Sequence, residues 1–306
     1  MTKHTTKSAH VLKHQCKDGS GGNQDLGIRQ GSQGTGEGCQ GTSLGTGHGN
    51  LGISQGSLGT CQDGSGSSQS GSRFSQSGII DLYNKISKLY PEAHSELLEP
   101  FRGNPVDVLV ATILSQATND TLSKRAFSEL KAQFHDWESV LVEDPCNVEA
   151  ALACGGLQRQ KTKKIRSALS KLKQDFGDIT LGPLFDWPKQ KSMEYLTSLP
   201  GVGPKTAACV LAFGLGKPAF PVDTHILRIA RRLGLAGKKQ NASSVQNMFE
   251  NLVPDEIKMP FHIMLIHHGR EMCSSRKPKC MSCPLKETCC HAQEAGTLPN
   301  EPIEAR

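Results

Sequence analysis

The chain has 306 residues and a formal net charge of +6, and no apolar run approaches the roughly 18 consecutive residues that a membrane-spanning helix needs. Of its 32 glycines, 19 lie in residues 1–78, which hold only 14 apolar side chains. Such a segment cannot offset the entropy of ordering its backbone, about 1 to 2 kcal/mol per residue. We therefore expect a disordered Gly/Ser/Gln-rich tail over 1–78 and a folded part beyond it.

The number of cysteines and the N-terminal sequence indicate the cellular compartment of the protein. Eleven cysteines is an odd number, and the N-terminus has no apolar core of a secretory signal. We expect a soluble, intracellular protein whose thiols are free or bind a metal. The first 17 residues contain no acid, which allows an organelle transit peptide, but they also lack arginine, which argues against one.

Apolar residues recur at helical spacing from Ile79 onward, and alternating β-branched runs are almost absent. The pattern predicts an all-α fold of about ten short helices joined by Gly/Pro turns. The expected helices cover residues 79–89, 106–114, 122–130, 150–153, 161–172, 193–199, 205–213, 224–233, 242–252 and 259–268.

The sequence LPGVGPKTAACVLAFG, residues 199–214, predicts a tight hairpin between two helices. Gly201 and Gly203 flank the single residue Val202, and Pro204 occupies the favoured first position of the second helix. The amide N–H groups at that helix start are unpaired and can bind a phosphate. An ordinary helix corner is the simpler explanation for an isolated GxG pattern.

Two further residues attract attention because of their positions at helix starts. Lys205 lies in a first turn, where the helix dipole disfavours a cation, so it is either a phosphate contact or an amine tuned for nucleophilic work. Asp223, in the sequence VDTHILRIARRLG, has the chemistry of an N-cap, and a cap is its simplest role. We interpret His225 as a structural histidine.

The C-terminal region contains four cysteines in the pattern Cys-x6-Cys-x2-Cys-x5-Cys. The residues alone suit tetrahedral zinc slightly better than an iron–sulfur cluster. Three basic side chains between the first two cysteines suggest a phosphate-facing loop. The cysteines are Cys273, Cys280, Cys283 and Cys289, and the basic residues are Arg276, Lys277 and Lys279.

These three motifs, in this order and at these separations, resemble the endonuclease III-like DNA glycosylases of the helix-hairpin-helix superfamily. The resemblance covers about residues 79–289 and implies two helical lobes with a cleft between them. Residues 98–217 would form a helical barrel that ends in the hairpin, and residues 79–97 and 218–306 would form the cluster lobe. Lys205 and Asp223 would then face each other across the cleft.

The resemblance also implies an activity and a cofactor. The protein would be a bifunctional DNA glycosylase and AP lyase that excises damaged bases, with oxidised pyrimidines as the family default. Lys205 would attack the sugar C1′ and Asp223 would support it. The four cysteines would hold a [4Fe–4S] cluster, and Cys290 would not be a ligand because the family's spacing selects Cys289.

Binding partners and DNA contacts follow from the same resemblance. The partner would be double-stranded DNA carrying a damaged base or an abasic site, bound by a monomer in the nucleus, or alternatively in a chloroplast or mitochondrion, without a membrane. The expected DNA contacts are Gly201, Val202, Gly203, Gln116, Arg276, Lys277 and Lys279. The family usually fills the gap left by the flipped nucleotide with a glutamine at the position of Ala117, so either Gln116 or another side chain takes this role here.

Two other classes of function stay open at this point. A monofunctional glycosylase of the same fold would leave the strand intact, but such enzymes commonly lack a lysine at the position of Lys205. A non-catalytic DNA-binding module with a structural metal would need neither Lys205 nor Asp223, so their joint presence counts against it.

Overall fold

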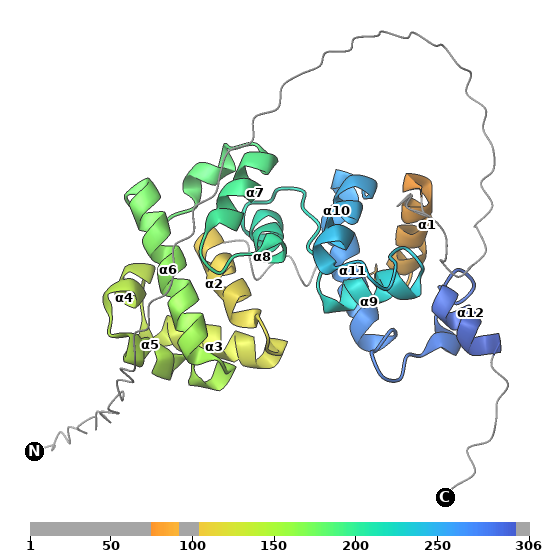
Figure 1. Ribbon diagram of the computed structural model, residues 1–306, viewed down its shortest axis with the longest axis horizontal. Coiled ribbons are helices and arrows are strands. Elements are labelled where there is room, and N and C mark those ends of the chain that lie inside the picture. The colour runs from red at the N-terminus through yellow and green to blue at the C-terminus, as the bar shows by residue number, and fades with distance from the viewer. Residues whose placement is uncertain (1–74, 92–103, 298–306) are drawn as a thin grey trace, which may run out of the picture. The chain divides into compact units, whose positions relative to one another are not determined.

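The computed structural model describes residues 75–91 and 104–297, with side chains up to residue 294. Throughout these residues the regular elements are helices, with no strand, which confirms the predicted all-α class (Figure 1). The predicted tail lies almost entirely outside the described residues. The first helix begins at Gln76 rather than Ile79, because the Ser75 hydroxyl accepts a hydrogen bond from the Gly78 N–H and caps it.

The helices agree with the predicted segments in most places. They are α1 (Gln76–Ser87), α2 (Pro105–Ser115), α3 (Asp120–Gln133), α4 (Trp137–Val142), α5 (Pro145–Ala151), α6 (Gln158–Phe176), α7 (Lys189–Ser198), α8 (Pro204–Cys209), α9 (Thr224–Arg232), α10 (Ala242–Leu252), α11 (Lys258–Glu271) and α12 (Cys290–Thr297).

The structure differs from the expectation at three places. The helix expected over 205–213 changes at Cys209 into a π-helical stretch, η5 (Val210–Gly214). The short helices α4 and α12 were not expected, since six to eight residues are too few for a periodic signal. The helix expected over 150–153 lies earlier, as α5.

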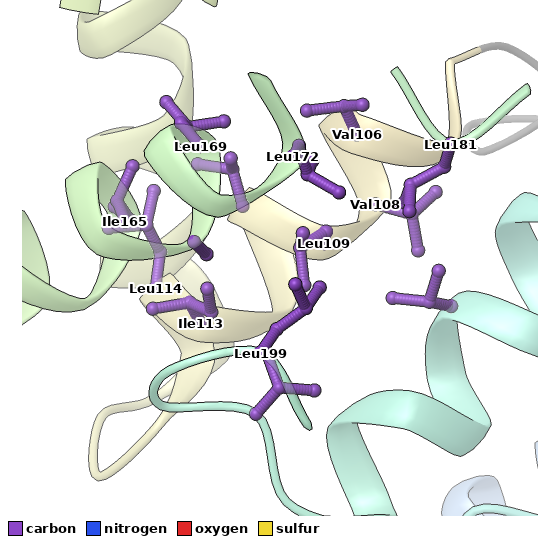
Figure 2. Close-up of a cluster of buried hydrophobic side chains, with 14 of the residues drawn as sticks. Val106, Val108, Leu109, Ile113, Leu114, Ile165, Leu169, Leu172, Leu181 and Leu199 are labelled. Atoms are coloured by element: carbon purple, nitrogen blue, oxygen red, sulfur yellow. The ribbon is translucent and has the colours of Figure 1, made fainter. Parts of the chain in front are cut away.

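The first of two hydrophobic clusters is built around α2, which packs against α3, α6, α8 and η5 (Figure 2). Its side chains at Leu109, Ile113 and Leu114 are fully buried, as are Ile165 and Leu169 from α6. Apolar residues cover nearly the whole circumference of α2, which explains why this helix lies in the interior. We call this cluster the α2 core.

The second hydrophobic cluster is formed by α1, α9, α10 and α11 together with residues near the C-terminus. Three phenylalanine rings lie at its centre: Phe220 stacks on Phe249 with ring centroids 4.7 Å apart, and both meet Phe261 edge-on. The side chains of Phe213 and Met259 pack against both clusters. The two clusters are therefore in contact, although the lobe boundaries stay a prediction.

None of the described helices is long and apolar enough to cross a membrane.

Candidate active site and cysteine loop

The predicted hairpin forms between α7 and α8. Gly201 has φ 79°, in the left-handed region that favours glycine, and a Cβ there would lie 2.7 Å from Cγ of Lys164. Val202 is buried, while Gly203 and Pro204 are exposed at the start of α8. No side chain caps α8, so this helix start keeps the amide geometry expected of a phosphate contact.

Both ends of the Gln116 side-chain amide are bound, one to the hairpin and α8 and the other to Lys164 of α6. Its Nε2 donates to the carbonyl oxygen of Gly201 at 3.1 Å and to Oγ1 of Thr206 at 3.3 Å, and its Oε1 accepts from Nζ of Lys164 at 2.8 Å. The next residue, Ala117, is exposed and has φ 53°. Gln116 would have to break these bonds before it could enter a DNA duplex.

Lys205 lies in the first turn of α8 and is largely buried. Nearby Cys209, one helical turn later, and then Asp223 raise the pKa of Lys205, while burial opposes them. Burial in turn raises the pKa of Cys209, which keeps the sulfur a neutral thiol near neutral pH. The carboxylate of Asp223, with a smaller contribution from Asp120, therefore favours the ammonium form of Lys205 further.

Asp223 is the N-cap of α9, as its position in the sequence predicted. Its Oδ1 accepts a hydrogen bond from the Ile226 N–H at 2.8 Å. This cap uses one of two carboxylate oxygens, and the negative charge still acts on Lys205. A structural cap and a charge that acts on the amine are thus compatible in one side chain. His225 is engaged by Arg228, whose Nη2 lies 3.1 Å from its Nδ1, consistent with a structural histidine.

Three more residues near Lys205 and Asp223 were not identified from the sequence. Asp120, at the start of α3, also raises the pKa of Lys205 and forms an ion pair with Arg270 of α11. His262 is buried, 2.8 Å from the carbonyl oxygen of Pro221, and burial lowers its pKa to about 4. The third residue is Cys209. Of the three, it alone could have been found from the sequence, because a residue four positions after Lys205 lies on the same face of a helix.

The four predicted cysteine ligands approach one another in the loop between α11 and α12, residues 273–289. Burial first, and to a smaller extent the charge that the other three cysteines carry when ionised, raise the pKa of Cys283. Burial is likewise the main cause of the raised pKa of Cys289, and Cys273 and Cys280 raise it further. The four sulfurs therefore lie near enough for the charge of one, when ionised, to disfavour ionisation of another. We call residues 273–289 the cysteine loop.

Side chains of α9 and α11 fasten the cysteine loop. Nη1 of Arg232 donates to Sγ of Cys273 at 3.2 Å and to the carbonyl oxygen of Ser274 at 2.7 Å, and Nε2 of His268 lies 3.7 Å from Sγ of Cys283. The sulfur of Cys290 instead lies 3.7 Å from the carbonyl oxygen of Leu233.

Within the part of the chain that the structure describes, no three His, Cys, Asp or Glu side chains are arranged around a position for a single metal ion. A four-iron cluster does not require such a position, because each cysteine binds a different iron.

The basic side chains of the loop lie on its surface. Arg276, Lys277 and Lys279 are exposed, and none of the ion pairs among the described residues involves them. A hydrogen bond of 2.7 Å from the Ser274 hydroxyl to the Lys277 carbonyl oxygen shapes the turn. These charges are available to a phosphate.

Comparison with known proteins gives the class to which this fold and site belong. Residues 110–255 match the family model of the HhH-GPD superfamily of base excision DNA repair proteins. The chain is 31% identical to endonuclease III of Bacillus subtilis over 69% of its own length and 91% of that protein. It is 37% identical to a putative DNA glycosylase of Arabidopsis thaliana over 56% of its own length and 58% of that protein, less than two thirds.

A solved structure of endonuclease III trapped in a covalent complex with DNA superimposes with a TM-score of 0.64 at 27% identity, covering 73% of this chain and 99% of the other. The chain therefore belongs to the endonuclease III family within the HhH-GPD superfamily of base excision DNA repair proteins. The resemblance inferred from the three sequence motifs is confirmed.

Proposed function

We propose that the protein is a bifunctional DNA glycosylase and AP lyase that uses Lys205 as its nucleophile. One observation supports this most directly. The fold brings a largely buried amine at the start of α8 under the influence of the carboxylate of Asp223, which comes from the separate helix α9. A nearby carboxylate and a buried amine suit attack on an electron-poor sugar carbon.

The raised pKa of Lys205 defines the first step. A lysine is an ammonium near neutral pH, and the raised pKa of Lys205 favours that form further, so the amine must lose a proton before it can attack the sugar C1′. The nitrogen bonds to C1′ as the bond from C1′ to the base breaks, and the departing base takes up a proton. Opening of the sugar ring then gives an imine between Lys205 and C1′.

Strand cleavage follows from that imine. Loss of a proton from C2′ expels the 3′ phosphate by β-elimination, and water then hydrolyses the imine and returns Lys205 as a free amine. Throughout these steps the carboxylate of Asp223 stabilises positive charge that develops on the sugar and the nitrogen. Because the sugar carbon is inaccessible inside a stacked duplex, the nucleotide must flip out first.

We infer that Cys273, Cys280, Cys283 and Cys289 hold a [4Fe–4S] cluster. The donor set supports this, since four thiols of one short loop interact electrostatically and one of them accepts a hydrogen bond from Arg232. When bound, the cluster would order the loop that carries Arg276, Lys277 and Lys279.

DNA binding is proposed for two surfaces. The hairpin before α8, with Gly201, buried Val202 and Gly203, would present backbone N–H groups to one phosphate, and the basic side chains of the cysteine loop would contact others. Gln116 is better suited to bracing the hairpin than to filling a gap in the duplex, because both ends of its amide are bound.

Substrate, assembly and location complete the proposal. We infer that oxidised pyrimidines and abasic sites in double-stranded DNA are the substrates, that one chain acts as a monomer, and that the nucleus is the site of action, with an organelle as the alternative. The support is membership of a family whose relatives are named as endonuclease III.

A nicking and trapping assay tests the activity. Wild-type protein should nick duplexes with an oxidised pyrimidine and, with borohydride present, form a permanent cross-link to DNA. Lys205→Gln should bind DNA but form no cross-link, because it has no amine to make the imine. Asp223→Asn keeps an oxygen for the cap, so it should fold while its turnover falls by about 100-fold or more.

The same assay separates the alternatives. Base release without nicking or cross-linking would indicate a monofunctional glycosylase, and neither reaction on any damaged duplex would indicate a non-catalytic module. A cross-link of normal yield from Lys205→Gln would contradict Lys205 as the nucleophile. If Asp223→Asn failed to fold, the cap would be the whole role of Asp223.

A further inference from the structure

Two side chains of α10 hold the segment of residues 218–222, which leads into Asp223. Oε1 of Glu250 accepts from the Phe220 N–H at 2.6 Å, and Oε1 of Gln246 accepts from the Val222 N–H at 3.3 Å. Helix α10 is thus joined to this segment by hydrogen bonds from the backbone of the segment to side chains of the helix.

The other end of the Gln246 amide reaches a second segment. Its Nε2 donates to the carbonyl oxygen of Pro204 at 3.2 Å, at the start of α8. Pro204 directly precedes Lys205, and Val222 directly precedes Asp223. One side-chain amide therefore connects the residue before the proposed nucleophile to the residue before the carboxylate that acts on it.

Burial and the need to donate and accept at once make this bridge specific for an amide side chain. The side chain of Gln246 is only 3% exposed, so water cannot easily replace a broken hydrogen bond. An amide can donate and accept at the same time, whereas an ionised carboxylate only accepts and would repel the carbonyl oxygen of Pro204. Glu250 has a different role, because its carboxylate pairs with Lys189 and Lys258 as well as the Phe220 N–H.

We propose that Gln246 is a positioning residue for the reaction, one that fixes the separation of Lys205 and Asp223 without touching the substrate. This inference rests on the proposed lyase function. Displacement of a reacting group by about 1 Å can slow an enzyme by about 100-fold, so a bridge that ties both segments has a large effect on rate. We expect a small effect on DNA affinity, because Gln246 bonds neither to an amide N–H of the hairpin nor to a side chain of the basic loop.

The primary test is Gln246→Met, which keeps the length of the side chain and removes both hydrogen bonds. The rate of borohydride-trapped imine formation on abasic DNA, measured in a single turnover at saturating enzyme, should fall by about 10- to 100-fold, with the dissociation constant for DNA changed by less than about twofold. Gln190→Met is the matched control, since Gln190 is exposed on α7 and bonds only to Glu194 among the described residues. Its rate should equal the wild-type rate.

A second variant separates positioning from a loss of stability. In Gln246→Glu, the protonated acid can still donate to Pro204 and accept from Val222, whereas the ionised acid cannot donate. The rate relative to wild type should therefore rise toward one as the pH falls. Thermal denaturation of each variant checks that the assays are run on folded protein.

Several results would overturn the proposal. These are imine formation by Gln246→Met at the wild-type rate, a relative rate of Gln246→Glu that does not change with pH, or a rate loss that merely follows the unfolded fraction. If the wild-type protein formed no imine at all, the lyase function would fail and the positioning role with it. A wild-type cross-link together with an unaffected Gln246→Met would overturn the positioning role alone.

Discussion

The α2 core and the cysteine loop are held together by different forces. Around α2, fully buried side chains such as Leu109, Ile113 and Leu114 fill the space between helices (Figure 2). In the cysteine loop only Leu285 and Cys289 are buried among the apolar residues. Hydrogen bonds from arginines of α9 to its backbone take the place of apolar packing.

This difference has a consequence for stability. Each fully buried leucine or isoleucine contributes about 1.5 to 3 kcal/mol, so the α2 core has enough apolar surface to fold from its own side chains. The cysteine loop has too little, and we expect it to depend on the bound cluster, as small metal-binding loops generally do.

Replacement of one cysteine of the proposed cluster site should produce the largest effect, the loss of the whole cluster. Cys283→Ser should abolish cluster binding and leave no iron or sulfide, whereas we expect the wild-type protein to carry about four of each. Iron and sulfide analysis of freshly purified protein is the measurement. Cys290→Ser is the matched control and should keep the cluster. Stoichiometric zinc without sulfide in the wild-type protein would contradict the cluster assignment.

A cavity in the α2 core should act on stability and spare the metal site. Leu109→Ala removes a fully buried side chain and should lower the free energy of unfolding by about 2 to 5 kcal/mol. Denaturant unfolding measures this decrease. The iron content per folded chain should stay at the wild-type value, and a drop in iron would show that the two regions are not independent.

Acid should weaken the second hydrophobic cluster before the α2 core. Burial lowers the pKa of His262 from 6.5 to about 4, so the unfolded chain binds a proton that the folded chain rejects. The stability that depends on neutral His262 is complete above pH 6.5 and is lost as the pH falls toward 4. The slope is about 1.4 kcal/mol per pH unit for one group.

The pH dependence can be measured by unfolding at several pH values. His262→Gln should show a flatter curve between pH 6.5 and 4, because this variant has no imidazole to protonate. Identical curves for the variant and the wild type would mean that another group causes the acid sensitivity.

The smallest expected effect concerns the surface of the cysteine loop. Replacing Arg276, Lys277 and Lys279 together by glutamine should weaken binding to all duplexes alike. The slope of the logarithm of DNA affinity against the logarithm of salt concentration should become shallower by about 1 for each phosphate that the loop no longer neutralises. Binding titrations at several salt concentrations measure the slope. Lys173→Gln, on the exposed side of α6, is the control. An unchanged slope would show that the loop does not face DNA.

Short-range patterns in the sequence were enough to predict much of this protein. Apolar spacing located most helices, because a helix places residues three and four apart on one face. The hairpin followed from two glycines and a proline, and Gly201 indeed has the positive φ that this turn requires. Lys205 and Asp223 could be singled out because a charge at a helix start has a strong local meaning.

The tertiary structure decided what depends on contacts between distant segments. Gln116 braces the hairpin rather than standing free, Asp120 pairs with Arg270, and Gln246 joins Pro204 to Val222. In each case the partners are distant in the chain, and no local pattern relates them. The orientation of such side chains is set by the packing of whole helices, so it emerges only when those helices are in place.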